Sequence, residues 1–487
     1  MITAILSLTL FLIIITGYAL KTIRKPRQYP PGPKWYPFIG CSNAVQNMSK
    51  KYGSQWKGLS MLAKEYSTQV LGIKLGKELV VVVYGEKNIR QVFIENEFEG
   101  RPDTFFLRLR CLGKRMGITF SDGPLWKEHR HFTIKHLKNV GFGKLIMEEE
   151  IQNVVLNMVE YINKNNDKPF NPKNMFSTGV MNILWHFVAG ETIKEEDLQY
   201  LLELLNTRSK AFSMAGGWLN QMPWSRFLFP ELSGYTLICK INQQISTIIE
   251  EAIKKHMNNA VDGNDFMYSF LREMHENNQN YTEEHLKIIC LDMIIAGSQT
   301  TSNALGFAFL VLLRNPQIQE IIYNEIVECI GDNMPSSADS QKLVYTSAFL
   351  LETQRYYTIV PLAGPRRVLT DTYIGGYFIP RETTILISLG DLHFDPDLWD
   401  DPNEFKPERF IDKQGKLKNP EHMYPFGLGR RRCPGDSLAK SFIFIVFTAI
   451  VQRFKISSKN GVLGSDKPII GLLSEPSPYT VEFSSRN

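Results

Sequence analysis

The sequence predicts a mainly α-helical protein with small β-sheets and an N-terminal membrane anchor. Apolar residues recur at helical spacing from Leu145 to His256 and from Glu283 to Arg314, which predicts helix over long parts of the chain. Residues Thr68 to Tyr84 alternate and are rich in branched side chains, which predicts two strands. The uncharged, largely apolar run Ile2 to Leu20 covers about 28 Å as a helix, enough to span a bilayer.

Composition places the chain among globular proteins that can enclose a cofactor. Of 487 residues, 43% are hydrophobic and 22% charged, which excludes a disordered chain. No repeat or low-complexity linker divides the sequence after its N-terminal region, so we expect one large domain over residues 34–487. The six cysteines lack paired spacing, as expected in a reducing compartment. No basic stripe or motif favours nucleic-acid binding.

Residues 1–21 are predicted as a transmembrane anchor and residues 22–33 as a basic, proline-rich hinge. A cleaved signal peptide is the alternative, but the apolar run is too long, and neither a basic segment before it nor a small-residue cleavage site after it is present. Basic residues follow the run directly, which predicts that the domain lies in the cytosol. The proline-rich segment from Tyr29 to Pro33 is stiff and cannot continue the helix.

The loop from Pro425 to Gly435 presents Cys433 just before an apolar segment, Leu438 to Phe454, that predicts a helix. Pro434 suits a first helical position, so Cys433 is expected at the positive end of that helix, where thiolate is favoured over thiol. Such a cysteine is a candidate metal ligand. The alternative is a buried structural thiol.

Five residues of this loop carry a family resemblance: Phe426, Gly429, Arg431, Cys433 and Gly435 resemble, in identity and spacing, the haem-ligand loop of the cytochrome P450 superfamily. The resemblance implies the cytochrome P450 fold, with haem b bound through the Cys433 thiolate and the other four residues shaping the haem loop. It also implies a monooxygenase that uses O2 and receives electrons from NADPH through a separate flavoprotein reductase, with cytochrome b5 as a further partner. The whole chain is most similar to insect microsomal members, which implies a location in the endoplasmic reticulum membrane.

Other segments resemble further parts of that haem site. Trp126 and Arg130 lie one helical turn apart, and with Arg366 they resemble residues that hold the haem propionates. Glu352 and Arg355, followed by Arg409, resemble a buried Glu/Arg/Arg network that supports the haem-binding core. For each segment the ordinary alternative is a surface helix or a surface ion pair.

The helix from Glu283 to Arg314 resembles the oxygen-binding helix of the family. Ala296 and Thr300 share one face, and Gly297 in mid-helix suggests that haem and dioxygen need the space. Thr300 is expected to hold a water that supplies protons. Gln299 stands where the family usually has a carboxylate, and an amide orients water without exchanging a proton.

The expected substrate is a lipophilic small molecule, such as a terpenoid hormone, steroid, fatty acid or xenobiotic, that is hydroxylated or epoxidised. We expect an irregular loop over Arg101 to Phe120 and two later strands to line the substrate cavity, and the apolar segment around Trp224 to contact the bilayer. The candidate substrate-lining residues are Phe105, Phe106, Phe212, Met214, Ile359, Leu362 and Leu472. A basic surface for an acidic reductase is predicted at Lys127, Lys135, Lys138, Arg430, Arg432 and Lys440.

Two other functions remain open at the level of sequence. One is a haem-thiolate isomerase or dehydrase on the same fold, which needs neither O2 nor reductase and which Gln299 favours slightly. The other is a non-enzymatic haem-binding sensor. Thr300 argues against both, because proton delivery to dioxygen is a requirement of monooxygenation.

Overall fold

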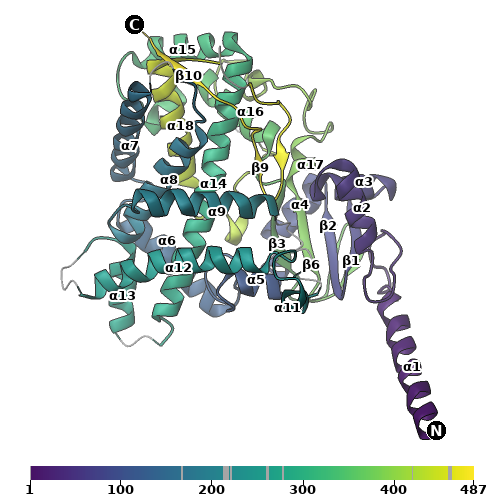
Figure 1. Ribbon diagram of the computed structural model, residues 1–487. Helices are drawn as coiled ribbons and strands as arrows, with labels where there is room; N and C mark the ends of the chain where they lie inside the picture. Colours follow the sequence, from purple (N-terminus) through teal and green to yellow (C-terminus); the bar gives the residue numbers. More distant parts are fainter. Residues whose placement is uncertain are drawn as a thin grey trace.

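The computed structural model describes residues 2–165, 168–211, 219, 222–258, 263–276, 279–418, 421–458 and 463–486. Helices make up the larger part of the molecule, the main sheet lies to one side, and helix α1 extends away from the body on the sheet side (Figure 1). The predicted mainly helical fold with small sheets is confirmed.

The helices differ widely in length. The longer ones are α1 (Ile2–Ile23), α2 (Ser42–Tyr52), α3 (Gln55–Glu65), α4 (Glu86–Ile94), α6 (Pro124–Asn139), α7 (Leu145–Lys164), α8 (Lys173–Ala189), α9 (Glu195–Ala211), α12 (Tyr235–Asn258), α13 (Phe266–His275), α14 (Glu283–Arg314), α15 (Pro316–Ile330), α16 (Val344–Tyr357) and α18 (Asp436–Arg453). The short ones are α5 (Phe105–Arg110), α11 (Ser225–Leu228), α17 (Leu389–His393) and the 3-10 turns η1 (Asn96–Phe98), η2 (Ser337–Gln341), η3 (Pro407–Phe410) and η4 (Gly429–Arg431).

The main sheet has four strands in the order β1 (Val70–Leu75), β2 (Glu78–Val83), β6 (Thr384–Ser388) and β3 (Leu362–Arg367). β2 and β6 pair in parallel, and the other pairs are antiparallel. The two strands predicted over Thr68 to Tyr84 are therefore confirmed as β1 and β2. The remaining strands form two-stranded pairs: β7 (Phe454–Ser457) with β10 (Glu482–Ser485), β4 (Thr372–Ile374) with β5 (Tyr377–Ile379), and β8 (Ile469–Ile470) with β9 (Ser474–Glu475).

Two hydrophobic cores hold these elements. The larger core surrounds α14, which is buried along most of its length because α8, α12 and α18 pack against it. The smaller core lies around the main sheet and α4. Burial of this extent is the main stabilising contribution in a domain of this size.

The expectation of an irregular loop over Arg101 to Phe120 is wrong in part, because α5 occupies Phe105–Arg110. The Thr104 side chain caps this helix by accepting a hydrogen bond from the Leu107 N–H at 3.3 Å. One short turn of six residues lies below the length at which apolar periodicity identifies a helix.

Helix α1 contains the segment predicted as an anchor. Leu10, Ile13, Ile14 and Leu20 are exposed on it, and its end is joined to the body by Phe38, whose backbone N–H donates to Thr22 Oγ1 at 3.3 Å. Among the residues that the structure describes, no helix combines the length and apolar character needed to cross a membrane.

Candidate functional site

The cysteine loop is a tight turn followed by a helix. Gly427 and Gly429 have φ values of 68° and 67°, and a Cβ atom on Gly429 would collide with the Phe93 carbonyl oxygen. The Cys433 N–H donates to the Phe426 carbonyl at 2.9 Å, which closes the loop. Pro434 is not the first helical residue as predicted, because α18 begins at Asp436 with Gly435 as its N-cap. Cys433 therefore lies three residues before the helix.

The Cys433 side chain retains exposed surface at this loop. Burial nevertheless raises the pKa of its thiol, and this effect exceeds the opposing effect of the Gly435 N–H that donates to the sulfur. The expected preference for thiolate is therefore wrong for the chain by itself. A metal cation at the sulfur is the kind of partner that favours thiolate.

A group of guanidinium side chains lies next to the loop. Arg431 donates through Nε to the Glu99 carbonyl at 3.0 Å and through Nη1 to the Ser121 carbonyl at 2.9 Å, while its buried Nη2 has no partner among the described residues. Arg101 donates to the Gly364 and Pro365 carbonyls at 2.9 and 2.6 Å, and its Nε is likewise buried without a partner. These contacts leave donors of two buried cations unused.

Arg366 on β3 is 4% exposed, and its guanidinium has no hydrogen bond or ion pair with the described residues. Burial, and then the charge of Arg101, lowers the pKa of Arg366 to about 8. Burial and the same neighbour lower the pKa of Arg431 to about 8, and burial lowers that of Arg101 to about 10. Glu99 and Asp122 oppose this lowering, but burial and neighbouring guanidiniums outweigh them, so the cluster Arg101, Arg366 and Arg431 keeps an excess of positive charge.

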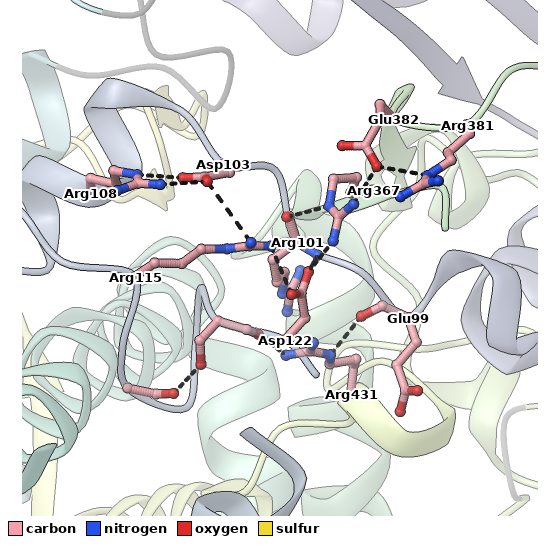
Figure 2. A network of polar contacts seen from close by, with 12 residues as sticks. Glu99, Arg101, Asp103, Arg108, Arg115, Asp122, Arg367, Arg381, Glu382 and Arg431 are labelled. Atoms are coloured by element: carbon pink, nitrogen blue, oxygen red, sulfur yellow. Dashed lines mark hydrogen bonds and ion pairs between the residues drawn. The ribbon is translucent and has the colours of Figure 1, made fainter. Parts of the chain in front are cut away.

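Asp122 offsets this excess only in part, because its oxygens accept from other donors. Figure 2 shows its carboxylate among arginines, accepting from the Arg101 backbone N–H at 2.7 Å, from Arg115 at 2.7 Å and from Arg367 at 2.8 Å. None of these bonds uses Arg101 Nε or Arg431 Nη2, which remain without a partner among the described residues. The cluster can therefore bind an external group that carries carboxylates.

Trp126 and Arg130 lie on α6, as the sequence predicted. The Trp126 ring supports Arg431, whose Cζ lies 3.3 Å from the ring centroid, and its indole N–H donates to the Ile118 carbonyl at 3.0 Å. Arg130 donates to the Arg432 carbonyl. The structure thus brings both residues to the cysteine loop.

The predicted oxygen-helix residues lie in the middle of α14. Ala296 is exposed and Thr300 is partly exposed although the helix around them is buried, so this face borders open space. The Thr300 hydroxyl donates to the Ala296 carbonyl at 3.2 Å, and Gln299 is buried. Gly297 was expected to make room for haem and dioxygen, but a Cβ there would lie 2.6 Å from Leu184 Cδ2, so packing against α8 uses the space.

Glu352, Arg355 and Arg409 form a connected buried network. Arg355 donates to both carboxylate oxygens of Glu352 at 2.7 and 2.8 Å, and Arg409 Nε donates to Glu352 Oε1 at 3.1 Å. Arg355 also donates to the carbonyls of His393, Pro402 and Glu404, which joins α16 to the segment that leads to the cysteine loop. These contacts give the three residues a structural role.

The candidate substrate-lining residues are dispersed over several elements. Phe106 is buried in a small cluster with Leu219 and Ile238, and Phe105 packs against that cluster. Ile359 packs against the helical core, Leu362 is buried in the sheet core, and Leu472 lies between β8 and β9. Phe212 and Met214 lie outside the described residues.

The residues present fit a haem. Cys433 offers a sulfur ligand, the arginine cluster matches a group with two carboxylates, and the open face of α14 offers space beside an apolar core. Sequence reasoning missed Arg101. No local pattern identifies it, because its neighbours Gly364 and Pro365 are far away in the chain.

Comparison with known proteins shows the family of this chain. The cytochrome P450 family model matches residues 30–483. The chain is 38% identical to probable cytochrome P450 305a1 of Drosophila melanogaster over 99% of this chain and 100% of that protein. It is 36% identical to the farnesoate epoxidase of Bombyx mori over 99% of each chain, and 35% identical to cytochrome P450 2J5 of Mus musculus over 97% of this chain and 95% of the mouse protein. This chain therefore belongs to the cytochrome P450 monooxygenase family.

Proposed function

We propose that this protein is a haem-thiolate monooxygenase that inserts one oxygen atom of O2 into a lipophilic small molecule. The second oxygen atom leaves as water, formed with two electrons from NADPH and two protons. The observation that carries this proposal is the cluster of buried, under-neutralised arginines beside Cys433. A structural cysteine has no need of such a cluster, whereas a ligand with two carboxylates does.

Each residue of the site has a task in this proposal. Cys433 ligates the haem iron, and Arg101, Arg130, Arg366 and Arg431 hold the propionates, with Trp126 supporting Arg431. Thiolate-ligated haem, when bound, supplies the oxygen-activating chemistry. Glu352, Arg355 and Arg409 keep the haem-binding core in place.

Proton delivery is assigned to Thr300, with Gln299 beside it. The Thr300 hydroxyl now donates to the Ala296 carbonyl, so its oxygen can still accept a hydrogen bond from a water on the open face of α14. Gln299 can orient water but cannot release a proton, so the protons must pass through bound water.

Electrons come from a separate NADPH-dependent flavoprotein reductase, with cytochrome b5 as a second donor. The six basic residues predicted for its docking surface are all exposed: Lys127, Lys135, Lys138, Arg430, Arg432 and Lys440. Such a surface attracts an acidic partner and raises the rate of encounter.

We further propose that residues 1–21 anchor the protein in the endoplasmic reticulum membrane, with residues 22–33 as hinge and the catalytic domain, 34–487, in the cytosol. The apolar run Ile2 to Leu20 and the exposed apolar side chains of α1 support this. Trp224, Phe227 and Leu228 are also exposed and form a second membrane contact. Membrane partitioning of a protein lacking residues 1–28, before and after Trp224→Ser, tests that contact; equal partitioning would contradict it.

The substrate class is lipophilic. A relative that matches over almost the whole chain carries the name farnesoate epoxidase. Terpenoids are therefore the first compounds to screen, before steroids and fatty acids. Oxidation of these ligands by purified protein should require both reductase and O2. Turnover without either would favour the isomerase or dehydrase alternative, and a shift of the haem band with no product would favour a sensor.

A further inference from the structure

A buried cation on α9 has no partner in the part of the chain that the structure describes. Arg208 is 7% exposed and forms no hydrogen bond or ion pair with any residue that the structure describes. An unpaired guanidinium in a protein interior is costly, because desolvation is not offset by a counter-charge. A side chain of this kind is retained at a site where a ligand brings the missing charge.

The neighbours of Arg208 include a second positive charge and leave too little negative charge for both. Arg110 and Cys111 lie within electrostatic range of it, and Arg110 is a second buried guanidinium. Asp292 on α14 pairs with Arg110 at 2.6 Å and also accepts the backbone N–H groups of Ile118 and Thr119 at 2.8 and 2.9 Å. Both oxygens of Asp292 are thus engaged. This one carboxylate has to balance the two positive charges of Arg110 and Arg208.

Asp292, the partner of Arg110, lies on the side of α14 that carries the proposed oxygen-binding residues. Asp292, Ala296 and Thr300 follow one another at four-residue intervals, so they share one side of α14. From Asp292 to Thr300 the helix rises about 12 Å. The walls nearby are aromatic, because Phe120 lies 4.8 Å beneath the Arg110 guanidinium and Phe105 and Phe106 belong to the neighbouring apolar cluster.

We propose that Arg208 binds the carboxylate of a lipophilic acid, and that the apolar chain of this acid extends along α14 toward Thr300. This inference rests on the proposed function and narrows its substrate class to long-chain or terpenoid acids. Oxidation then falls on a carbon remote from the carboxylate, because Asp292, which pairs with the Arg110 near Arg208, lies about two helical turns from Thr300.

The charge state of Arg208 is compatible with this role. Burial, and then the charge of Arg110, lowers its pKa to about 9, so the guanidinium remains protonated at neutral pH. A ligand carboxylate beside Arg208 would offset both its burial and the repulsion from Arg110. A neutral ester of the same shape would leave the guanidinium unpaired, and a site built for a charged group rejects the analogue that lacks it.

The test uses the full-length holoprotein with myristic acid and methyl myristate, each below its solubility limit. Binding is followed by the shift of the haem absorption band and by calorimetry. We expect the acid to bind at least about 10-fold more tightly than the ester, since a hydrogen-bonded charge contributes about 1.5 kcal/mol or more. Arg208→Gln should remove this preference and leave ester binding unchanged. Arg208→Lys should retain part of it.

Arg108→Gln is the matched control, because Arg108 is exposed and already paired with Asp103 at 2.6 Å. It should bind both ligands as the wild type does. Equal affinity of the wild type for acid and ester, or an unchanged acid preference in Arg208→Gln, would overturn the inference. The proposed function fails separately, if the reduced, carbon monoxide-treated protein lacks the spectrum of thiolate-bound haem.

Discussion

The side chains of Arg101, Arg366 and Arg431 are the main evidence, at the scale of single residues, for the proposed haem site. Each is more than 90% buried, and their unused donors point to a missing anion. Without that anion, burial and then the charges of neighbouring guanidiniums lower the pKa of each. Binding of two propionates is therefore expected to stabilise the folded chain as well as retain the haem.

Replacing Arg366 separates the effect of the propionates on haem retention from their effect on the stability of the folded chain. Arg366→Gln should speed haem loss about 10-fold, because a charged hydrogen bond is removed. The same change should raise the thermal stability of the haem-free protein, because a buried unpaired charge is removed. Haem transfer to a scavenging protein and thermal unfolding of the haem-free form measure the two effects. Arg381→Gln, at an exposed arginine, should change neither; slower haem loss in Arg366→Gln would contradict the assignment.

Between elements, the Glu352 network joins α16 to the chain that leads to Cys433. Glu352 and Arg355 are both 0% exposed, so removal of one charge strands the other in the interior. Glu352→Gln should therefore lower the free energy of unfolding by about 3–5 kcal/mol in urea titrations. Asp339→Asn breaks the more exposed pair with Lys342 and should cost less than about 1 kcal/mol. Equal losses in the two variants would show that the network has no special role.

A second contact, between α12 and α13, should respond to pH. His256 Nδ1 lies 2.7 Å from the Ala252 carbonyl and Nε2 lies 3.1 Å from Asp265, so the doubly protonated ring fits both acceptors. Burial lowers the pKa of His256, but Asp265, the Ala252 carbonyl and Glu191 raise it more, and the net shift is upward. The other titratable groups around this pocket are His186, Lys255, which pairs with Glu191, and Tyr268.

The sign of the pH dependence follows from the raised pKa. The stabilisation is complete below the ordinary histidine pKa of about 6.5 and is lost as pH rises through the higher pKa of the folded state. Urea unfolding of wild type and His256→Gln should therefore differ more at pH 6 than at pH 8.5. Asp265→Asn should remove the same dependence. A wild-type advantage that grows with pH would be the opposite of this prediction.

The sequence predicted best those features that depend on neighbours in the chain. The turn at Gly427 to Gly429 and the helix after Cys433 follow from local residues, although Pro434 proved to lie outside that helix. Arg101 and Arg208 were missed, because what distinguishes them is the lack of a partner after distant segments have packed. Gly297 was noticed but misread, since its close neighbour Leu184 comes from another helix.

At the scale of the whole molecule, the exposed basic residues proposed to dock the reductase lie on α6, in the cysteine loop and on α18. Arg430→Glu combined with Lys440→Glu should slow reduction by an acidic flavoprotein, and the difference should shrink as salt screens the charges. Stopped-flow reduction at several ionic strengths measures this. Lys50→Glu with Lys51→Glu, exposed on α2, is the charge-matched control. An equal effect of both pairs would indicate a response to net charge and not to a docking surface.

The central claim is that Cys433 ligates a haem as thiolate. The direct measurement is the absorption spectrum of the reduced, carbon monoxide-treated protein, for the wild type and for Cys433→Ser. The wild type should show the red-shifted band of thiolate-bound haem, and Cys433→Ser should lose it. Absence of that band from haem-loaded wild type, or its persistence in Cys433→Ser, would contradict the account.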